Sequence, residues 1–229
     1  MDLLIAAVLL LQDKSAEETF KKIEERIEKA ETLTVNFSLD ATSGEEYHVT
    51  GSLLTKQGNR IDVRWKGSIG GVESTGFIKS NGMTMRYDLG PSYRGEKETP
   101  KNLSNGFATA MARTGIIPSL EMGNRPDQQD RTAKEDIDFK ERFVVSNFET
   151  GADDGGKKTL QYTLQVMRGS DLVEDPKFRV RIWYHPETYA LAKREMSNET
   201  NKTKCVEVYQ MTLVNANVSD EKFKFPADK

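Results

Sequence analysis

The chain has 229 residues, of which 36% are hydrophobic and 30% are charged, and its formal net charge is −3. This length is enough to bury a core, and a balanced charge without a basic face or tail argues against a nucleic-acid partner. Cys205 is the only cysteine, which excludes an internal disulfide and a cysteine-based metal cluster.

Residues 1–12 are an almost wholly apolar run, and strongly charged sequence follows at once from Asp13. The run is too short for a membrane-spanning helix, which needs about 20 residues, but it has the length of a signal-peptide h-region. Position 2 is Asp, so the usual positive n-region is missing; an upstream start codon would explain this, and a buried N-terminal helix turn is the alternative. We predict a signal peptide at residues 1–12 and one domain at residues 13–229.

Residues 15–30 have the pattern of an amphipathic helix. Ser15 and Glu18 have the spacing of a capping box at its start. One apolar stripe recurs at three- and four-residue steps and predicts a helix that packs on a sheet: Ala16, Phe20, Ile23, Ile27 and Ala30.

After residue 32 the period changes from 3.6 to 2, which indicates strands with one apolar and one polar face. Five strands at residues 33–39, 47–53, 61–65, 72–79 and 83–87 are joined by tight turns such as Asn81-Gly82. Further strands are predicted at residues 142–149, 159–167, 178–184, 189–196 and 204–214. The total is about ten strands in an antiparallel meander.

The middle of the chain has a different pattern. Residues 90–100 are predicted to be irregular, and residues 102–122 to form one or two short helices broken at Gly115 and Pro118. A weakly constrained helical cover of this kind could act as a lid. Residues 123–133 are polar and predicted to be a mobile loop. The predicted fold is therefore α+β, mainly β: a curled antiparallel sheet forming an unclosed (half) β-barrel, covered by an N-terminal helix and short lid helices.

The sequence is poor in residues that carry catalysis. His48 and His185 have no Cys, His or carboxylate at metal-ligand spacing, so both are predicted to be solvated. Residues 67–71 are Gly-rich but lack the Lys and the following helix of a phosphate loop, and are predicted to be a hairpin turn. We therefore predict no catalytic residues, no metal and no cofactor. Six methionines at positions 83, 85, 111, 122, 167 and 196 are either core filler or an adaptable binding surface.

Five short motifs occur in an order that resembles the periplasmic lipoprotein carriers of the LolA/LolB superfamily. They are Val-Asn-Phe-Ser at residues 35–38, Gly-Ser-Leu-Leu at 51–54, Arg-Ile-Asp-Val-Arg-Trp at 60–65, the Asn81-Gly82 hairpin running to Tyr87, and Phe-Lys-Phe-Pro at 223–226. The resemblance implies an apolar cavity that receives the acyl chains of lipoproteins or lipids. It also implies a soluble periplasmic monomer, which an inner-membrane complex loads and an outer-membrane acceptor unloads. No lipid-attachment Cys follows the apolar run, so the chain resembles the soluble carrier rather than the anchored acceptor.

One departure concerns the lid. Carriers of this family place Arg-Pro between the second and third strands, and that arginine helps to lock the lid. Here residues 56–60 are Lys-Gln-Gly-Asn-Arg, so this lock is absent.

The predicted lining of the cavity combines the apolar positions of the first five strands with those of the lid: Val35, Phe37, Leu39, Val49, Leu53, Val63, Trp65, Met83, Met85 and Tyr87, then Phe107, Met111, Ile116 and Ile117. A sensor or protein-interaction module on the same fold is the alternative. An enzyme acting on lipids or glycans ranks last, because it would need polar groups that converge inside the cavity.

Overall fold

The computed structural model describes residues 2–90, 94–116, 139–166, 177–200 and 202–225. Helix α1 (Asp2–Glu28) precedes a meander of six strands: β1 (Thr32–Ser43), β2 (Glu45–Lys56), β3 (Arg60–Ile69), β4 (Val72–Asn81), β5 (Thr84–Asp88) and β6 (Arg94–Glu98). Helix α2 (Leu103–Arg113) and the one-turn helix α5 (Phe139–Arg142) follow. The second meander is β7 (Phe143–Asp154), β8 (Lys157–Val166), β9 (Lys177–Tyr184), β10 (Leu191–Asn198) and β11 (Thr203–Val214), before the short 3₁₀ helix η1 (Asp220–Phe223).

The two meanders are joined into one sheet by the pairing of β1 with β11. The strand order is β6-β5-β4-β3-β2-β1-β11-β10-β9-β8-β7, and every neighbouring pair is antiparallel. The sheet is not closed, because β6 and β7 are its two edges. The predicted unclosed, mainly antiparallel architecture is confirmed, with eleven described strands where the sequence indicated about ten.

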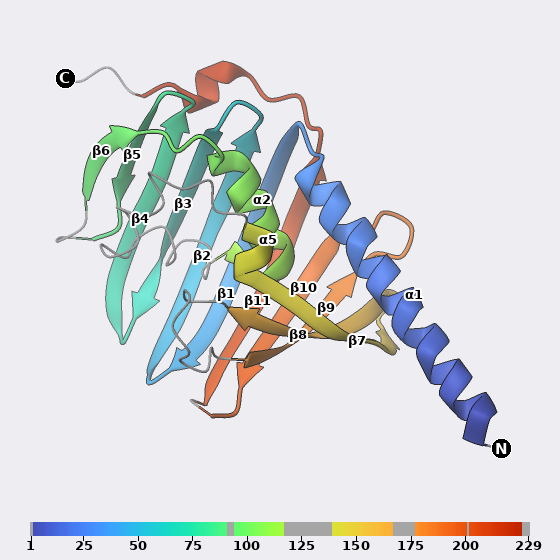
Figure 1. Ribbon diagram of the computed structural model, residues 1–229. Coiled ribbons are helices and arrows are strands. Elements are labelled where there is room, and N and C mark those ends of the chain that lie inside the picture. Colours follow the sequence, from blue (N-terminus) through green and yellow to red (C-terminus); the bar gives the residue numbers. More distant parts are fainter. Residues whose placement is uncertain (1, 91–93, 117–138, 167–176, 201, 226–229) are drawn as a thin grey trace.

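The helices lie on one face of the sheet, which we call the inner face (Figure 1). Helix α1 packs against β7 and α2. Its predicted apolar stripe is buried at Ala16, Phe20, Ile23 and Ile27. The centre of the Phe20 ring lies 4.8 Å from the centre of the Tyr162 ring on β8. In the described residues no helix is both long enough and apolar enough to cross a bilayer.

Two predictions about element boundaries were wrong. Helix α1 begins at Asp2, so Ser15 lies inside the helix and caps nothing; the Leu- and Ala-rich run before it consists of good helix formers and continues the helix. Residues 94–98 form an edge strand where irregular chain was predicted. That strand, Arg-Gly-Glu-Lys-Glu, has no apolar alternation, and its main-chain pairing with β5 decides its conformation.

Glycines let three aromatic rings lie flat on the inner face. A Cβ atom at Gly51 would come within 2.5 Å of the Phe37 ring, one at Gly76 within 2.1 Å of the Trp65 ring, and one at Gly95 within 2.9 Å of the Tyr87 hydroxyl. In all three pairs the glycine lies directly opposite the aromatic residue on the neighbouring strand. The glycines thus leave the space that the rings occupy.

The outer face is covered at one end by the C-terminal segment. Asp220 forms a 2.6 Å ion pair with Lys56 of β2, and Phe223 is buried with 1% exposure. The Arg86 guanidinium lies 4.4 Å from the centre of the Phe225 ring. The aromatic positions of the terminal motif therefore hold the chain end to the sheet.

We expect Gly76→Ala to destabilise the protein by about 1–3 kcal/mol, because the added methyl group would overlap the Trp65 ring. Urea unfolding measures the change, and the exposed neighbour Thr75→Ala is the control. In a Trp65→Ala background the cost of Gly76→Ala should largely disappear. An equal cost in both backgrounds would contradict the overlap.

Candidate functional site

The predicted lining residues mostly gather on the inner face of β1–β5 and on α2. Three aromatic residues of the set are only partly buried: Trp65, Tyr87 and Phe107. Ile117 lies outside the described residues. The others that belong to the core are almost fully buried: Val35, Phe37, Leu39, Val49, Leu53, Val63, Met85, Met111 and Ile116.

Met83 does not lie with the other lining residues. Its side chain is 77% exposed, and β5 begins only at Thr84. The alternation of Met83, Met85 and Tyr87 suggested one face, but the Asn81 carboxamide accepts hydrogen bonds from the backbone N–H groups of Met83 and Thr84 and extends the turn through Met83. The residue therefore projects into solvent.

The two halves of the inner face are packed differently. Beneath α1, most inward side chains of β8 and β9 are buried, whereas Val166 and Phe178 are partly buried. Five of the buried ones have exposures of at most 2%: Leu160, Tyr162, Leu164, Val180 and Ile182. In the half formed by β3–β6, Trp65, Tyr87 and Leu89 remain partly buried, together with Leu103 and Phe107 of α2. Partly buried apolar side chains thus occur on both β3–β6 and α2, beside buried inward residues such as Val63 and Ile78.

A buried arginine holds the C-terminal end of α2 against the sheet. Arg194 of β10 is 1% exposed and donates hydrogen bonds to the carbonyl oxygens of Met111 at 2.8 Å and Ala112 at 2.7 Å. The Tyr162 hydroxyl donates to the next carbonyl, that of Arg113, at 2.7 Å. The last carbonyls of a helix have no partner within the helix, and a cation also complements its negative end. Arg194 and Tyr162 supply hydrogen-bond donors to these carbonyls, and Arg194 also supplies the positive charge.

Glu207 of β11 completes this anchor. Its carboxylate accepts a 3.0 Å hydrogen bond from the Ile116 backbone N–H and a 2.6 Å hydrogen bond from the Tyr209 hydroxyl, and lies 4.0 Å from Arg194. Gly115 has a φ of +96°, and a Cβ there would come within 2.5 Å of the carboxylate. The chain can therefore turn after α2 only with glycine at this position.

The electrostatics of the anchor favour a charged arginine. Burial by itself lowers the pKa of Arg194, but Tyr209, Tyr162 and Glu207 outweigh burial and hold that pKa above its ordinary value. Burial raises the pKa of Tyr209 well above its usual range, so the phenol stays protonated and donates to Glu207. The guanidinium is thus compensated by one carboxylate and by helix carbonyls.

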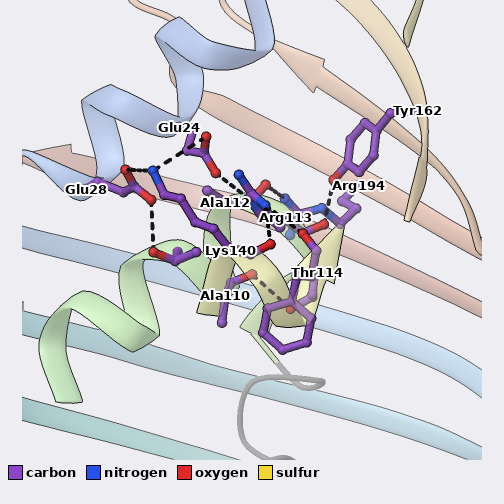
Figure 2. A network of polar contacts seen from close by, with 11 residues as sticks. Glu24, Glu28, Ala110, Ala112, Arg113, Thr114, Lys140, Tyr162 and Arg194 are labelled. Atoms are coloured by element: carbon purple, nitrogen blue, oxygen red, sulfur yellow. Dashed lines mark hydrogen bonds and ion pairs between the residues drawn. The ribbon is translucent and has the colours of Figure 1, made fainter. Parts of the chain in front are cut away.

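A second set of polar contacts joins α2 to α1 and α5 (Figure 2). Arg113 is paired with Glu24 of α1 and donates to the carbonyl of Phe143 at 2.6 Å. Glu28 accepts hydrogen bonds from Thr109 of α2 at 2.9 Å and from Lys140 of α5 at 2.8 Å. The three helices are therefore connected by charge-assisted hydrogen bonds, which are strong but depend on water exclusion.

The loop that lacks the family's Arg-Pro nevertheless holds the other end of α2. The Asn59 side-chain amide donates to the carbonyl of Lys101 at 2.5 Å, and its oxygen accepts from the backbone N–H of Ser104 at 3.2 Å. Arg60 instead contacts the Gln57 carbonyl and Asp220. Helix α2 is thus anchored at both ends, by residues that the sequence comparison with the carriers did not suggest.

The sequence analysis missed Arg194 and Glu207, although a signal was present. On β10 the inward positions include Arg194 and Met196, and on β11 they are Cys205, Glu207 and Tyr209. A charged residue at an inward position of a strand is unusual, because an unpaired buried charge is costly. Two such residues opposite each other would have indicated a buried pair, had the register of β10 and β11 been known.

The outer face carries a shallow depression of about 330 Å³, lined by polar residues that include Ser38, Asp40, Thr50 and Lys66. His48 lies here with a 62% exposed side chain, and its Nδ1 is 2.7 Å from an Asp40 carboxylate oxygen. His185 is also exposed, so both histidines are solvated, as predicted. Among the described residues no three His, Cys, Asp or Glu side chains are placed to hold a metal ion.

Several solved structures align with this chain over most of its length. LprF from Mycobacterium bovis superposes with a TM-score of 0.50 at 8% identity, covering 94% of this chain and 98% of its own. The LolA superfamily protein NE2245 from Nitrosomonas europaea aligns at 13% identity and a TM-score of 0.36, covering 92% and 97%. The MucA/MucB complex of Pseudomonas aeruginosa contains a further match at 10% identity and a TM-score of 0.40, covering 93% of this chain and 62% of that one.

No protein-family model matches the sequence, and no curated protein is similar to it in sequence. The chain shares its overall fold with LprF, and its unclosed antiparallel sheet is the architecture that the sequence predicted.

We expect Arg194→Met to destabilise the protein by about 3–5 kcal/mol, because it leaves the Glu207 carboxylate buried beside unpaired helix carbonyls. Lys193→Met on the same strand removes a surface pair with Glu195 and the contact of its ammonium with the Trp183 ring, 4.4 Å from the ring centre, and should cost about 1–2 kcal/mol. Urea unfolding compares the two. A change at Arg194 no larger than that at Lys193 would refute the anchoring role.

Proposed function

We propose that the protein is a soluble envelope carrier that binds the acyl chains of lipoproteins or lipids between the inner face of β3–β6 and helix α2. The proposal assigns it no catalytic step. The observation that carries it is the partly buried aromatic surface that Trp65 and Tyr87 form on the sheet and Phe107 forms on α2, a helix that is itself held at both ends. Shuttling towards the outer membrane is part of the proposal and follows the resemblance to the carriers.

The energetics of acyl burial suit such a surface. Each methylene removed from water contributes about 0.8 kcal/mol, so about ten of them contribute on the order of 8 kcal/mol before the cost of ordering the chain. Release then requires that the cover moves. Helix α2 is fixed by polar contacts at its two ends and by the burial of Ala108, Ala110, Met111 and Ala112 in the core, so its movement has to break both.

Two tryptophans on opposite faces make binding measurable. Trp65 lies on the inner face, whereas Trp183 lies on the outer face, where its indole N–H donates to Asp154 at 2.9 Å. In a Trp183→Phe background only Trp65 fluoresces. An acylated peptide should bind saturably and shift the Trp65 emission to shorter wavelength, and the same peptide without its acyl chain should not.

Native mass spectrometry of protein purified from its own envelope should show bound lipid. A lipid-free spectrum, together with no uptake of the acylated peptide, would exclude the carrier. Binding of the non-acylated peptide with equal affinity would instead favour the sensor or protein-interaction module.

Trp65→Leu should weaken binding of the acylated peptide by roughly 1–2 kcal/mol, because the ring supplies a large part of the contact surface. Affinity measured by displacement of a fluorescent acyl probe tests this. Val72→Ser, at a 69% exposed position on the neighbouring strand, is the control and should leave the affinity unchanged.

A further inference from the structure

Lys97 is the one residue of β6 that is not exposed. It is directly opposite Met85 of β5, whose side chain is almost fully buried in the core, and this register places Lys97 on the inner face. Its neighbours Glu96 and Glu98 alternate to the outer face, where Glu96 forms a 2.5 Å ion pair with Arg86. A cation therefore lies at the edge of the apolar surface.

The surroundings of this ammonium are apolar and aromatic. Its Nζ lies 5.8 Å from the centre of the Tyr87 ring, and burial lowers the pKa of Lys97 from its ordinary value. Within the described parts of the chain no carboxylate is paired with it. Elsewhere, lysines with comparable or greater burial have such partners: Lys79 lies 3.5 Å from Asp62, and Lys56 lies 2.6 Å from Asp220.

Burying half of a cation without a paired anion lowers the stability of the folded protein, and the contact with the Tyr87 ring at 5.8 Å offsets little of that loss. The cost is recovered when an anion binds next to it in an environment poor in water, where charge-assisted hydrogen bonds are strong. The apolar surface that begins beside Lys97 restricts what such an anion can be attached to. Across β5, β4 and β3 it runs from Tyr87 to Trp65, both partly buried, past Ile78, which is buried in the core, a span of roughly 15 Å at three inter-strand spacings.

We propose that Lys97 binds the anionic head, a carboxylate or a phosphate, of an acyl lipid whose chain lies against Tyr87 and Trp65. This inference rests on the proposed function, because it assigns a ligand class to the same surface. It makes the carrier selective for anionic amphiphiles over neutral ones of equal chain length.

The test compares ligands that differ only in the head group. Palmitate and cetyl alcohol form one pair, and a monoacyl phosphatidic acid and the matching monoacylglycerol form the other, each below its aggregation concentration. Displacement of a fluorescent acyl probe gives the affinities. The protein should prefer each anionic ligand by about tenfold, the size expected for one charge-assisted hydrogen bond. Inorganic phosphate alone should not displace the probe, because it lacks the chain.

Three variants assign the preference to the residue. Lys97→Met should remove it by weakening only the anionic ligands, while its unchanged affinity for cetyl alcohol shows that the surface is intact. Lys97→Arg should retain it. Lys66→Met removes the same charge at an exposed outer-face position and should behave as the unchanged protein.

The outcomes separate the two proposals. Equal affinity for palmitate and cetyl alcohol, or a preference that survives in Lys97→Met, overturns the role of Lys97 and leaves the acyl carrier standing. Failure of all four lipids to displace or bind overturns the carrier and the role of Lys97 together. Displacement by inorganic phosphate alone shows an anion site that does not depend on a lipid, and overturns the lipid assignment.

Discussion

The pairing of β1 with β11 brings together strands that are more than 160 residues apart and joins two meanders into one sheet. Without it, β1–β6 and β7–β11 would be two sheets, each with one apolar face exposed. With it, the inward side chains of both halves form a single curved surface that α1 and α2 cover (Figure 1). Since loop closure over such a distance is costly in entropy, the pairing is sustained by the core that it creates.

Helix α2 depends on this arrangement for its position. Its C-terminal carbonyls meet Arg194 of β10, the chain after it meets Glu207 of β11, and its N-terminal end meets Asn59 between β2 and β3. These partners come from both sides of the β1–β11 junction. Polar groups hold the two ends of α2, and Ala110, Met111 and Ala112 between them are buried in the core.

The asymmetry of the inner face follows from the positions of the helices and of the glycines. Helix α1 fills the concavity over β7 and β8, where Phe20, Phe148 and Tyr162 form an aromatic cluster with centroid distances of 4.8–6.0 Å. On the other side Gly76 and Gly95 keep Trp65 and Tyr87 flat against the sheet. One half is thus built around an aromatic cluster under α1, and the other has Trp65 and Tyr87 on its surface with Lys97 at its edge.

The sequence by itself determined most of the sheet. Alternation with a period of 2 is a local property, so every predicted strand is present with boundaries shifted by a few residues. Alternation could not predict β6, because pairing with β5 specifies that strand and its own composition does not. Alternation also could not predict the exposure of Met83, because a turn takes that residue out of the strand. The apolar lining was largely predictable for the same reason, since inward positions follow from alternation.

Only the tertiary structure decided what holds the cover and where charge meets the apolar surface. Arg194 and Glu207 are separated by a strand turn, and the carbonyls that Arg194 binds are more than 80 residues away. No local pattern records such a contact, because it depends on the register between strands and on the direction in which α2 crosses them. The sequence determined an apolar face, and the fold determined which part of that face is buried and which part stays partly exposed.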